Sequence, residues 1–535
     1  MSIKNSTSIP LSEIFTLGFL CMLFFAKGMG LYDGQPVFGL IIVAALFCFA
    51  AKMLMSSYSL REFIVVGILL ILGVATYLVS GEKGVLISIM MVTILKGVPM
   101  ERIFRAAFVT WTISFGGMFL LTATGLISSP FKIHERFGLG FLIRWGLGHS
   151  HPNVLHISYL TFAMLAIYVL GKRISPKWLL LLMLGNLYVF LYSLSTTGFI
   201  AVCFLLLLNL YWLLRRRFNI VEKVLVTLFL PCCLLLTFAA PFFLKGRVYE
   251  IVNRLVNTRL GLSRHFLMHN PISLWGTRTS VIMTPWFSLD NSYLFAYVAY
   301  GVIFFALAVM AYFLIIRRYL KEQKGMELSL IIASLAAGIT EPFLFNLSFK
   351  NVPLLFFGEL IYDDKKKSEQ KQLYFLPQKL REYSISTDEG VSGSIFKAGR
   401  WIRQKFSIHM DAYCQMSKKA CRHLYLLSAA VALCAAVLCA FFLPQPDTYI
   451  APKRHCDYIA EDAGFYLEPD FLAEVENVKV LGYIDAGTEM LEFSGHIATL
   501  EWLRGIITAG LLAGGLALFS APCLTLKSNH AKIRE

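Results

Sequence analysis

Residues 144–153, with the sequence RWGLGHSHPN, gather several side chains that can do chemistry directly in front of a long apolar run. His149 and His151 can exchange protons near neutral pH, glycine lets a backbone approach a ligand closely, and Pro152 suits the first turn of a helix. The N–H groups and the positive dipole end of a helix that begins here attract anions. The segment is therefore a candidate site for an anionic ligand. A plain helix-entry loop, whose histidines only form hydrogen bonds at the membrane interface, explains it equally well.

Two more polar segments stand at expected helix starts that face the same side. In YSLSTTG, residues 192–198, the hydroxyl groups can cap a helix or meet a polar ligand, and capping alone is the stronger interpretation. In LDNSY, residues 289–293, Asp290 or Asn291 can be the N-cap or a substrate contact, and the residues favour neither. Three polar helix starts on one side of the membrane indicate a site better than any one of them.

Arginines are concentrated in residues 244–290, a segment that we expect to face outward. Positive residues are usually depleted from outer loops, and the guanidinium fork suits phosphate and pyrophosphate. Snorkelling to lipid headgroups accounts for one or two such residues but not for the whole set. An anionic ligand on the outer side explains the set better. Its members are Arg247, Arg254, Arg259, Arg264 and Arg278.

Metal chemistry has little support in the residues. The pair His149 and His151 is not accompanied by a CxxC or HExxH pattern or by a second close histidine pair. We therefore expect neither a metal nor another cofactor. Glu341 and Lys350 lie near expected membrane boundaries, where they are either functional ions or a pair that joins two helices.

The composition indicates that a membrane holds these residues. The chain has 535 residues, of which 57% are hydrophobic and 15% charged, whereas soluble domains carry about 25% charged residues. The net charge of +16 arises largely from short Lys/Arg clusters between apolar runs, as the positive-inside rule predicts for cytoplasmic loops. We expect an all-α, polytopic integral membrane protein whose partner is the lipid bilayer and not a nucleic acid. The clusters are residues 172–177, 215–223, 317–324 and 365–371.

Apolar runs long enough to cross a bilayer predict fourteen spans, with both termini in the cytoplasm and the protein in the plasma or inner membrane. The two shortest, 85–95 and 351–361, could also be re-entrant. The spans lie near 11–29, 36–51, 63–80, 85–95, 107–127, 153–171, 178–193, 199–214, 224–243, 291–316, 328–345, 351–361, 423–443 and 502–525.

The spans and the loops between them predict three parts. Residues 1–362 form a core of about twelve spans, residues 363–422 a basic cytoplasmic linker, and residues 423–535 a two-span appendage. The outer segment of the appendage is acidic, and an ordinary solvated loop is preferred there over a small strand-and-helix unit. The outer segments are 128–152 and 244–290 in the core and 444–500 in the appendage.

The ordered set of motifs resembles the Wzy polysaccharide polymerases, and among them the Gram-positive capsule and exopolysaccharide members of the O-antigen ligase and polymerase superfamily. The likeness covers about residues 1–362, and each motif is short. Residues from 363 onward match no family known to us. The motifs are RWGLGHSHPN, SLSTTG, NTRL, WGTR, LDNSYL with YG shortly after, and EPFLFN.

This resemblance implies a glycosyltransferase that works on the outer face without a nucleotide sugar. Such enzymes take a growing glycan from an undecaprenyl pyrophosphate carrier and transfer its reducing end to the sugar of the next lipid-linked repeat unit. Relatives often have S-R-T-G where residues 195–198 of this chain are STTG, so any role of that arginine must be absent or supplied elsewhere. The family's motif residues correspond to Arg144, His151, Arg259, Asp290, Asn291 and Tyr293.

Cleavage of a sugar–pyrophosphate bond needs positive charge at the leaving group and removal of a proton from the acceptor hydroxyl. We assign Arg259, Arg254 and Arg144 to the pyrophosphate, and His151 to the proton of the acceptor or of the leaving group. The further partners of this reaction would be a flippase and a chain-length regulator. The other residues expected at the substrate are His149, Asn153, Arg264, Arg278, Asp290, Asn291 and Tyr293.

Three other functions remain open at this point. A flippase or transporter of lipid-linked oligosaccharide would place its polar groups near the membrane midplane, where this chain is largely apolar. A ligase that moves finished glycan to another acceptor would share the fold, the donor and most motifs. A non-catalytic membrane scaffold would leave the polar helix starts as coincidence.

Overall fold

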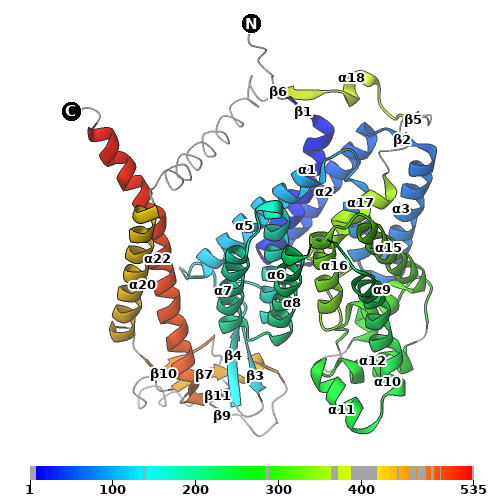
Figure 1. Ribbon diagram of the computed structural model, residues 1–535. Coiled ribbons are helices and arrows are strands. Elements are labelled where there is room, and N and C mark those ends of the chain that lie inside the picture. Colours follow the sequence, from blue (N-terminus) through cyan, green and yellow to red (C-terminus); the bar gives the residue numbers. More distant parts are fainter. Residues whose placement is uncertain are drawn as a thin grey trace. The chain divides into compact units, whose positions relative to one another are not determined.

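The computed structural model shows a mostly helical protein (Figure 1). Within the described residues, eleven helices are long and apolar enough to cross a membrane, as the prediction of a polytopic membrane protein requires. The structure describes residues 8–123, 125–136, 140–215, 217–270, 272–283, 288–346, 348–362, 372–386, 418–442, 445–446, 448–457, 465–466, 478–482, 487–494 and 496–532.

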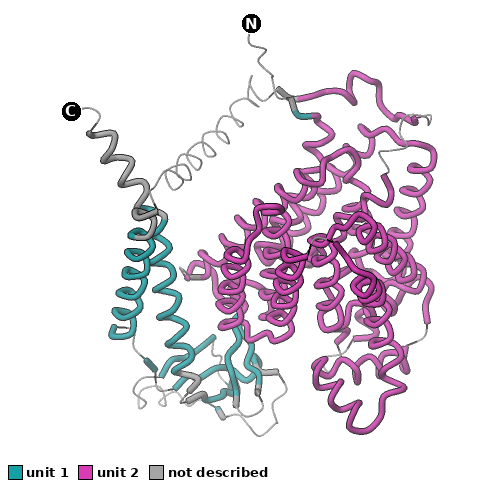
Figure 2. The backbone as a smooth tube through the Cα atoms, viewed as in Figure 1, with its two compact units in different colours: residues 1–9, 131–145, 385–535 teal, residues 10–130, 146–384 magenta. Residues whose placement is uncertain are grey.

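The chain divides into two compact units, which Figure 2 colours separately. The larger unit holds residues 10–130 and 146–384, and the smaller unit holds residues 1–9, 131–145 and 385–535. Part of the expected outer loop of the core, residues 131–145, thus groups with the C-terminal appendage.

Helices of the larger unit begin and end close to the predicted spans. Several starts are capped by local side chains: in α3 and again in α9, the capping residue and a glutamate three positions later bond each other's backbone N–H groups. The elements are α1 (Leu11–Gly28), α2 (Pro36–Met55), α3 (Leu60–Ser80), α4 (Gly84–Thr93), α5 (Met100–Ala123), α6 (Pro152–Leu170), η1 (Gly171–Arg173), α7 (Pro176–Ser193), α8 (Thr196–Leu214), α9 (Ile220–Leu234), η2 (Leu235–Ala239), α10 (Ala240–Phe243), α11 (Gly246–Leu255), α12 (Arg259–His269), α13 (Thr279–Ile282), α14 (Ser292–Tyr300), α15 (Val302–Lys321), α16 (Gly325–Ala337), η3 (Val352–Phe357) and α17 (Gly358–Ile361).

The predicted span 291–316 is wrong as a single helix, because it breaks at Gly301 into α14 and α15. Gly301 has a φ of 87°, and a Cβ there would lie 2.4 Å from the carbonyl oxygen of Leu274. A Cβ on Gly276 would lie 2.0 Å from the carbonyl oxygen of Ala299. The backbone near Gly276 therefore passes the backbone near Gly301 so closely that a side chain at either glycine would clash.

The predicted span 328–345 is also wrong as a continuous helix, because α16 ends at Ala337. The segment that follows is irregular, and a buried side chain bonds part of its backbone. The side-chain amide of Asn351 donates to the carbonyl oxygen of Leu344 (2.6 Å) and to the hydroxyl of Tyr312 (2.7 Å). Irregular backbone at membrane depth is tolerated where protein buries it in this way.

The described part of the smaller unit includes a four-stranded and a three-stranded sheet, which the interpretation of 128–152 and 444–500 as loops did not favour. One sheet has the strand order β10-β7-β11-β9, and the other has the order β4-β3-β8. In the second, β3 pairs antiparallel with β4 and parallel with β8. The strands are β3 (Phe131–Arg136), β4 (Gly140–Trp145), β7 (Thr448–Pro452), β8 (Cys456–Asp457), β9 (Phe465–Tyr466), β10 (Val478–Val480) and β11 (Glu489–Ser494).

Two long helices of the smaller unit, α20 (Lys418–Phe442) and α22 (His496–Lys532), pack through small residues. The Ser428 hydroxyl donates to the Gly514 carbonyl oxygen (2.7 Å), a close approach typical of membrane helix pairs. The buried Arg504 of α22 donates to the carbonyl oxygen of Ile143 in β4 (3.0 Å), which anchors the hairpin to this helix.

Candidate functional site

The starts of two helices of the larger unit meet at the carboxylate of Glu341, just past the end of a third. Its Oε1 atom accepts a hydrogen bond from Nδ2 of Asn153 at the start of α6 (3.0 Å) and another from Oγ1 of Thr197 at the start of α8 (3.0 Å). Glu341 itself follows the end of α16 and is only 8% exposed. A carboxylate is stabilised by the positive dipole ends of the two helices that begin beside it.

The start of α14 is fixed to the same segment. The Ser292 hydroxyl donates to the backbone carbonyl oxygen of Glu341 (2.5 Å) and accepts from the Leu344 N–H (3.2 Å). The backbone N–H of Ser292 also donates to the carbonyl oxygen of Gly338 (2.8 Å). The three helix starts that the sequence singled out are therefore neighbours, and the residues after α16 join them.

His151 is the N-cap of α6 and not a detached loop residue. Its backbone is extended, and its Nδ1 atom accepts a hydrogen bond from the Asn153 N–H (3.1 Å). In the neutral ring, a proton must then reside on Nε2. The ring is therefore arranged to donate a hydrogen bond from Nε2.

His149 differs from His151 because it is completely enclosed. It is 1% exposed, it packs 5.6 Å from the ring of Phe115, and the described residues give neither ring nitrogen a hydrogen bond of good geometry. Burial, with help from the charge of Lys350, lowers the pKa of His149 to about 3, and the nearby carbonyl groups of Gly146 and Leu147 only partly oppose this. The ring is neutral at physiological pH, so it supplies shape and not charge.

Lys350 brings a buried amino group to the start of α6. Its Nζ atom donates to the carbonyl oxygen of Val154 (3.0 Å), and the residue is 4% exposed. It interacts electrostatically with both His149 and Glu341. Glu341 and Lys350, considered from the sequence as a pair, therefore both belong to a polar cluster at these helix starts.

Arg259 and Asp290 form a second pair near the start of α14. Nη2 of Arg259 lies 2.8 Å from Oδ2 of Asp290, and Nη1 donates to the Asn257 carbonyl oxygen (2.8 Å). The Arg259 side chain is 10% exposed and that of Asp290 31%. Asn257 and Thr258 have positive φ values of 52° and 66°, and this turn separates α11 from α12 and directs Arg259 inward.

The other four arginines of residues 244–290 have exposed side chains, and within the described residues none of them has an ion pair. Arg247 and Arg254 lie before the break between α11 and α12, and Arg264 and Arg278 lie after it. They offer positive charge that no described carboxylate neutralises. They are Arg247, Arg254, Arg264 and Arg278.

Asn291 and Tyr293 make contacts that support α14. Oδ1 of Asn291 accepts from the N–H groups of Tyr293 (2.9 Å) and Leu294 (3.1 Å), and its Nδ2 donates to Oγ1 of Thr237 (3.0 Å). The Tyr293 hydroxyl donates to the Leu335 carbonyl oxygen (2.7 Å). Both side chains are buried, so Asn291 acts as the N-cap and Tyr293 joins α14 to α16.

Arg144 lies in the smaller unit. It occupies β4 opposite Lys132 of β3, and it is buried. The sequence indicated Glu341 and Lys350 only as functional ions or a helix-joining pair, and Thr197 only as part of residues 192–198, so none of the three was assigned to the substrate. Within the described residues, no group of three His, Cys, Asp or Glu side chains could hold a metal ion.

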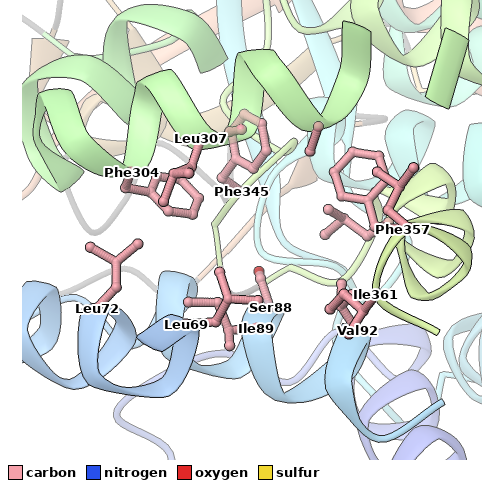
Figure 3. Close-up of a pocket in the computed structure, with 14 residues that line it drawn as sticks. Leu69, Leu72, Ser88, Ile89, Val92, Phe304, Leu307, Phe345, Phe357 and Ile361 are labelled. Atoms are coloured by element: carbon pink, nitrogen blue, oxygen red, sulfur yellow. The ribbon is translucent and has the colours of Figure 1, made fainter. Parts of the chain in front are cut away.

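An apolar cavity elsewhere in the larger unit has a different lining. Side chains of α3, α4, α15 and the η3–α17 segment face it, among them Leu69, Phe304 and Phe357 (Figure 3). Ser88 is the one hydroxyl residue among the lining side chains. This cavity suits hydrocarbon and offers nothing that would bind a pyrophosphate, so the polar helix starts are the candidate site.

Comparison with known proteins adds no relative: no family model, no curated protein and no solved structure matches the chain.

Proposed function

We propose that this protein is a membrane glycosyltransferase that polymerises lipid-pyrophosphate-linked oligosaccharide repeat units. The observation that carries the proposal is the assembly of three polar helix starts around Glu341, through Asn153, Thr197 and Ser292. Arg254 on α11 and Arg264 on α12 are exposed, lie in the same unit and are available to an anionic donor. The likeness of the ordered motifs to Wzy polymerases supplies the class of substrate.

In this reaction, the bond between the anomeric carbon and the pyrophosphate oxygen breaks, and a bond to the acceptor hydroxyl oxygen forms. The electron pair leaves with undecaprenyl pyrophosphate, whose negative charge Arg254, Arg259 and Arg264 would stabilise. The acceptor proton passes to a base. Asp290 suits this role because Arg259 holds only its Oδ2 atom and the carboxylate is about a third exposed (31%).

His151 has a different role in the proposal. Because its Nδ1 accepts from the Asn153 N–H, its Nε2 proton is the one that can reach a leaving-group oxygen. We therefore assign His151 as a donor to the pyrophosphate and not as the base.

The proposal places the candidate site on the outer face and both termini in the cytoplasm. The short helices support a core of twelve crossings. Lys96, just past α4, pairs with Glu62 at the start of α3, and the hydroxyl of Tyr362, just past α17, donates to the carbonyl oxygen of Thr93 at the end of α4 (2.6 Å). The segments containing α4 and α17 therefore reach the end of the bundle at which α3 begins.

The decisive experiment is deletion of the gene followed by analysis of carrier-linked glycans. Loss of a polymerase leaves single repeat units on the carrier, exposed on the outer leaflet. Loss of a ligase leaves long carrier-bound chains, and loss of a flippase leaves single units on the inner leaflet. Either of the last two results would overturn the proposal.

The residue assignment has its own test. Arg259→Ala should abolish chain extension, while the exposed Arg247→Ala, a matched change on the neighbouring helix, should leave most of it. Protein amount in membranes must be equal in both variants. Full-length polymer from Arg259→Ala would contradict the role of Arg259 without contradicting the polymerase.

A further inference from the structure

A polar cavity lies at the end of α8 away from Thr197. Trp212, one of its lining residues, is 15 positions further along α8, or about 22 Å along the helix axis. The cavity is bounded by the end of α8, the turn at η1, the loop before α9 and the turn between α15 and α16. Its lining residues are Gly171, Lys172, Ile174, Asn209, Trp212, Leu213, Arg215, Arg217, Phe218, Gln323, Lys324, Gly325, Met326 and Glu327.

Positive charge predominates in this cavity. Four lining residues are basic, and Glu327 is the one acidic member. Nε of Arg215 lies 3.6 Å from a carboxylate oxygen of Glu222, a long ion pair. Nζ of Lys324 lies 2.7 Å from a carboxylate oxygen of Glu322. Within the described residues, the other two basic side chains have no ion pair, and both are exposed. They are Lys172 and Arg217.

Hydrogen-bond donors accompany the charge. The indole Nε1 of Trp212 is buried and has no partner among the described residues. Helix α16 begins at the cavity without a side-chain cap, so its first N–H groups and its dipole favour an anion. A Cβ on Gly325 would lie 3.0 Å from Cγ of Trp212, so a glycine at the helix start allows the indole to pack there.

The surroundings of the cavity are apolar. Leu213 is 39% exposed, Leu214 78% and Ile220 80%, all at the ends of the membrane helices α8 and α9. A ligand with a phosphate group next to a hydrocarbon chain can bind the basic lining of the cavity and the apolar residues beside it. Basic pockets between membrane helices are known to take anionic lipid headgroups.

We propose that this cavity binds the phosphate headgroup of an anionic bilayer lipid. Three basic clusters that are separate in the sequence, at residues 172–177, 215–223 and 317–324, each contribute lining residues to the one cavity. The positive-inside rule explains the sign of these clusters but not their convergence around unsatisfied donors. The inference does not depend on the proposed glycosyltransferase activity.

The test measures lipid binding to the purified full chain in neutral detergent, by native mass spectrometry, with phosphatidylglycerol and phosphatidylcholine as probes. Wild type should bind phosphatidylglycerol preferentially. Lys172→Gln with Arg217→Gln should weaken this binding by roughly tenfold, because each basic residue near a headgroup contributes a several-fold factor. The matched control is Arg173→Gln with Lys177→Gln, which removes equal charge from neighbouring exposed residues that do not line the cavity.

Three further results decide the matter. Equal weakening by the control pair would show general surface attraction and would overturn the site. Trp212→Phe, which removes the indole N–H and leaves the charge of the cavity unchanged, should weaken binding on its own and gives a second variant beside the charge variant. Inorganic phosphate or glycerol 3-phosphate should not compete at equal concentration, and full competition would assign the cavity to a soluble phosphate instead of a lipid.

Discussion

Glu341 is the residue whose replacement should disturb the candidate site most. Glu341→Ala removes the acceptor that Asn153 and Thr197 share, so each of the two helix starts loses one hydrogen bond to a carboxylate. A hydrogen bond to a charged group contributes about 1.5–3 kcal/mol, so the two losses together cost roughly 4 kcal/mol. Glu341→Gln keeps an acceptor oxygen and loses only the charge, which the helix dipoles stabilise by about 1 kcal/mol.

The assay is the thermal unfolding midpoint of the purified protein in one detergent, together with the length of polymer made in cells. The expected order of stability is wild type, Glu341→Gln, then Glu341→Ala. Glu322→Ala, which removes an exposed glutamate that pairs with Arg318, is the control and should melt close to wild type.

A double variant tests the geometry directly. Asn153→Ala removes one of the two donors, so Asn153→Ala with Glu341→Ala should lower the melting temperature by less than the sum of the two single changes. If the two losses simply add, or if Glu341→Ala melts like wild type and makes full-length polymer, Glu341 does not join the helix starts.

Three other predictions follow from single contacts. The pKa of His149 is about 3 in the folded protein, against an ordinary 6.5, so between those two pH values the unfolded chain binds more protons than the folded one. The melting temperature should therefore fall as the pH drops below about 6.5. His149→Phe should reduce this dependence of the melting temperature on pH. Gly276→Ala puts a Cβ 2.0 Å from a backbone carbonyl oxygen, whereas the Cβ of Gly34→Ala, at a similar φ of 98°, meets nothing within 4 Å. Gly276→Ala should therefore lower the free energy of unfolding by roughly 2 kcal/mol more than Gly34→Ala. Equal yields of folded protein in membranes would contradict the close crossing. Arg504→Ala leaves the carboxylate of Glu501 buried without its partner, so it should lower the melting temperature more than Arg504→Met combined with Glu501→Leu.

Sequence patterns were sufficient wherever the relevant contact is local. Asn291 was considered as an N-cap because capping joins a side chain to N–H groups two or three residues later, and it does so here. The capping role considered for residues 192–198 also has a contact, since Ser195 Oγ accepts from the Gly198 N–H (3.4 Å). Long apolar runs likewise predicted most helices, since crossing a bilayer requires about 20 such residues.

Interruptions of helices were beyond the sequence. Apolar residues continue on both sides of Gly301, so hydropathy has no signal at the break between α14 and α15. The break depends on close passage of the Gly276 segment, which is a tertiary contact. The pairing of β3 with β8 joins residues more than 300 positions apart, so no local sequence pattern could predict it.

The class, the positions of most membrane-length helices and the polar helix starts could be predicted from the sequence alone, because hydropathy and capping act between residues that are close along the chain. Which of those polar residues meet was decided by the tertiary structure. Asn153 and Glu341 are 188 residues apart, and their contact exists because packing of α6, α8 and α16 brings the helix ends together. Polar groups removed from water must find partners within the protein, and only the folded arrangement determines which ones they find.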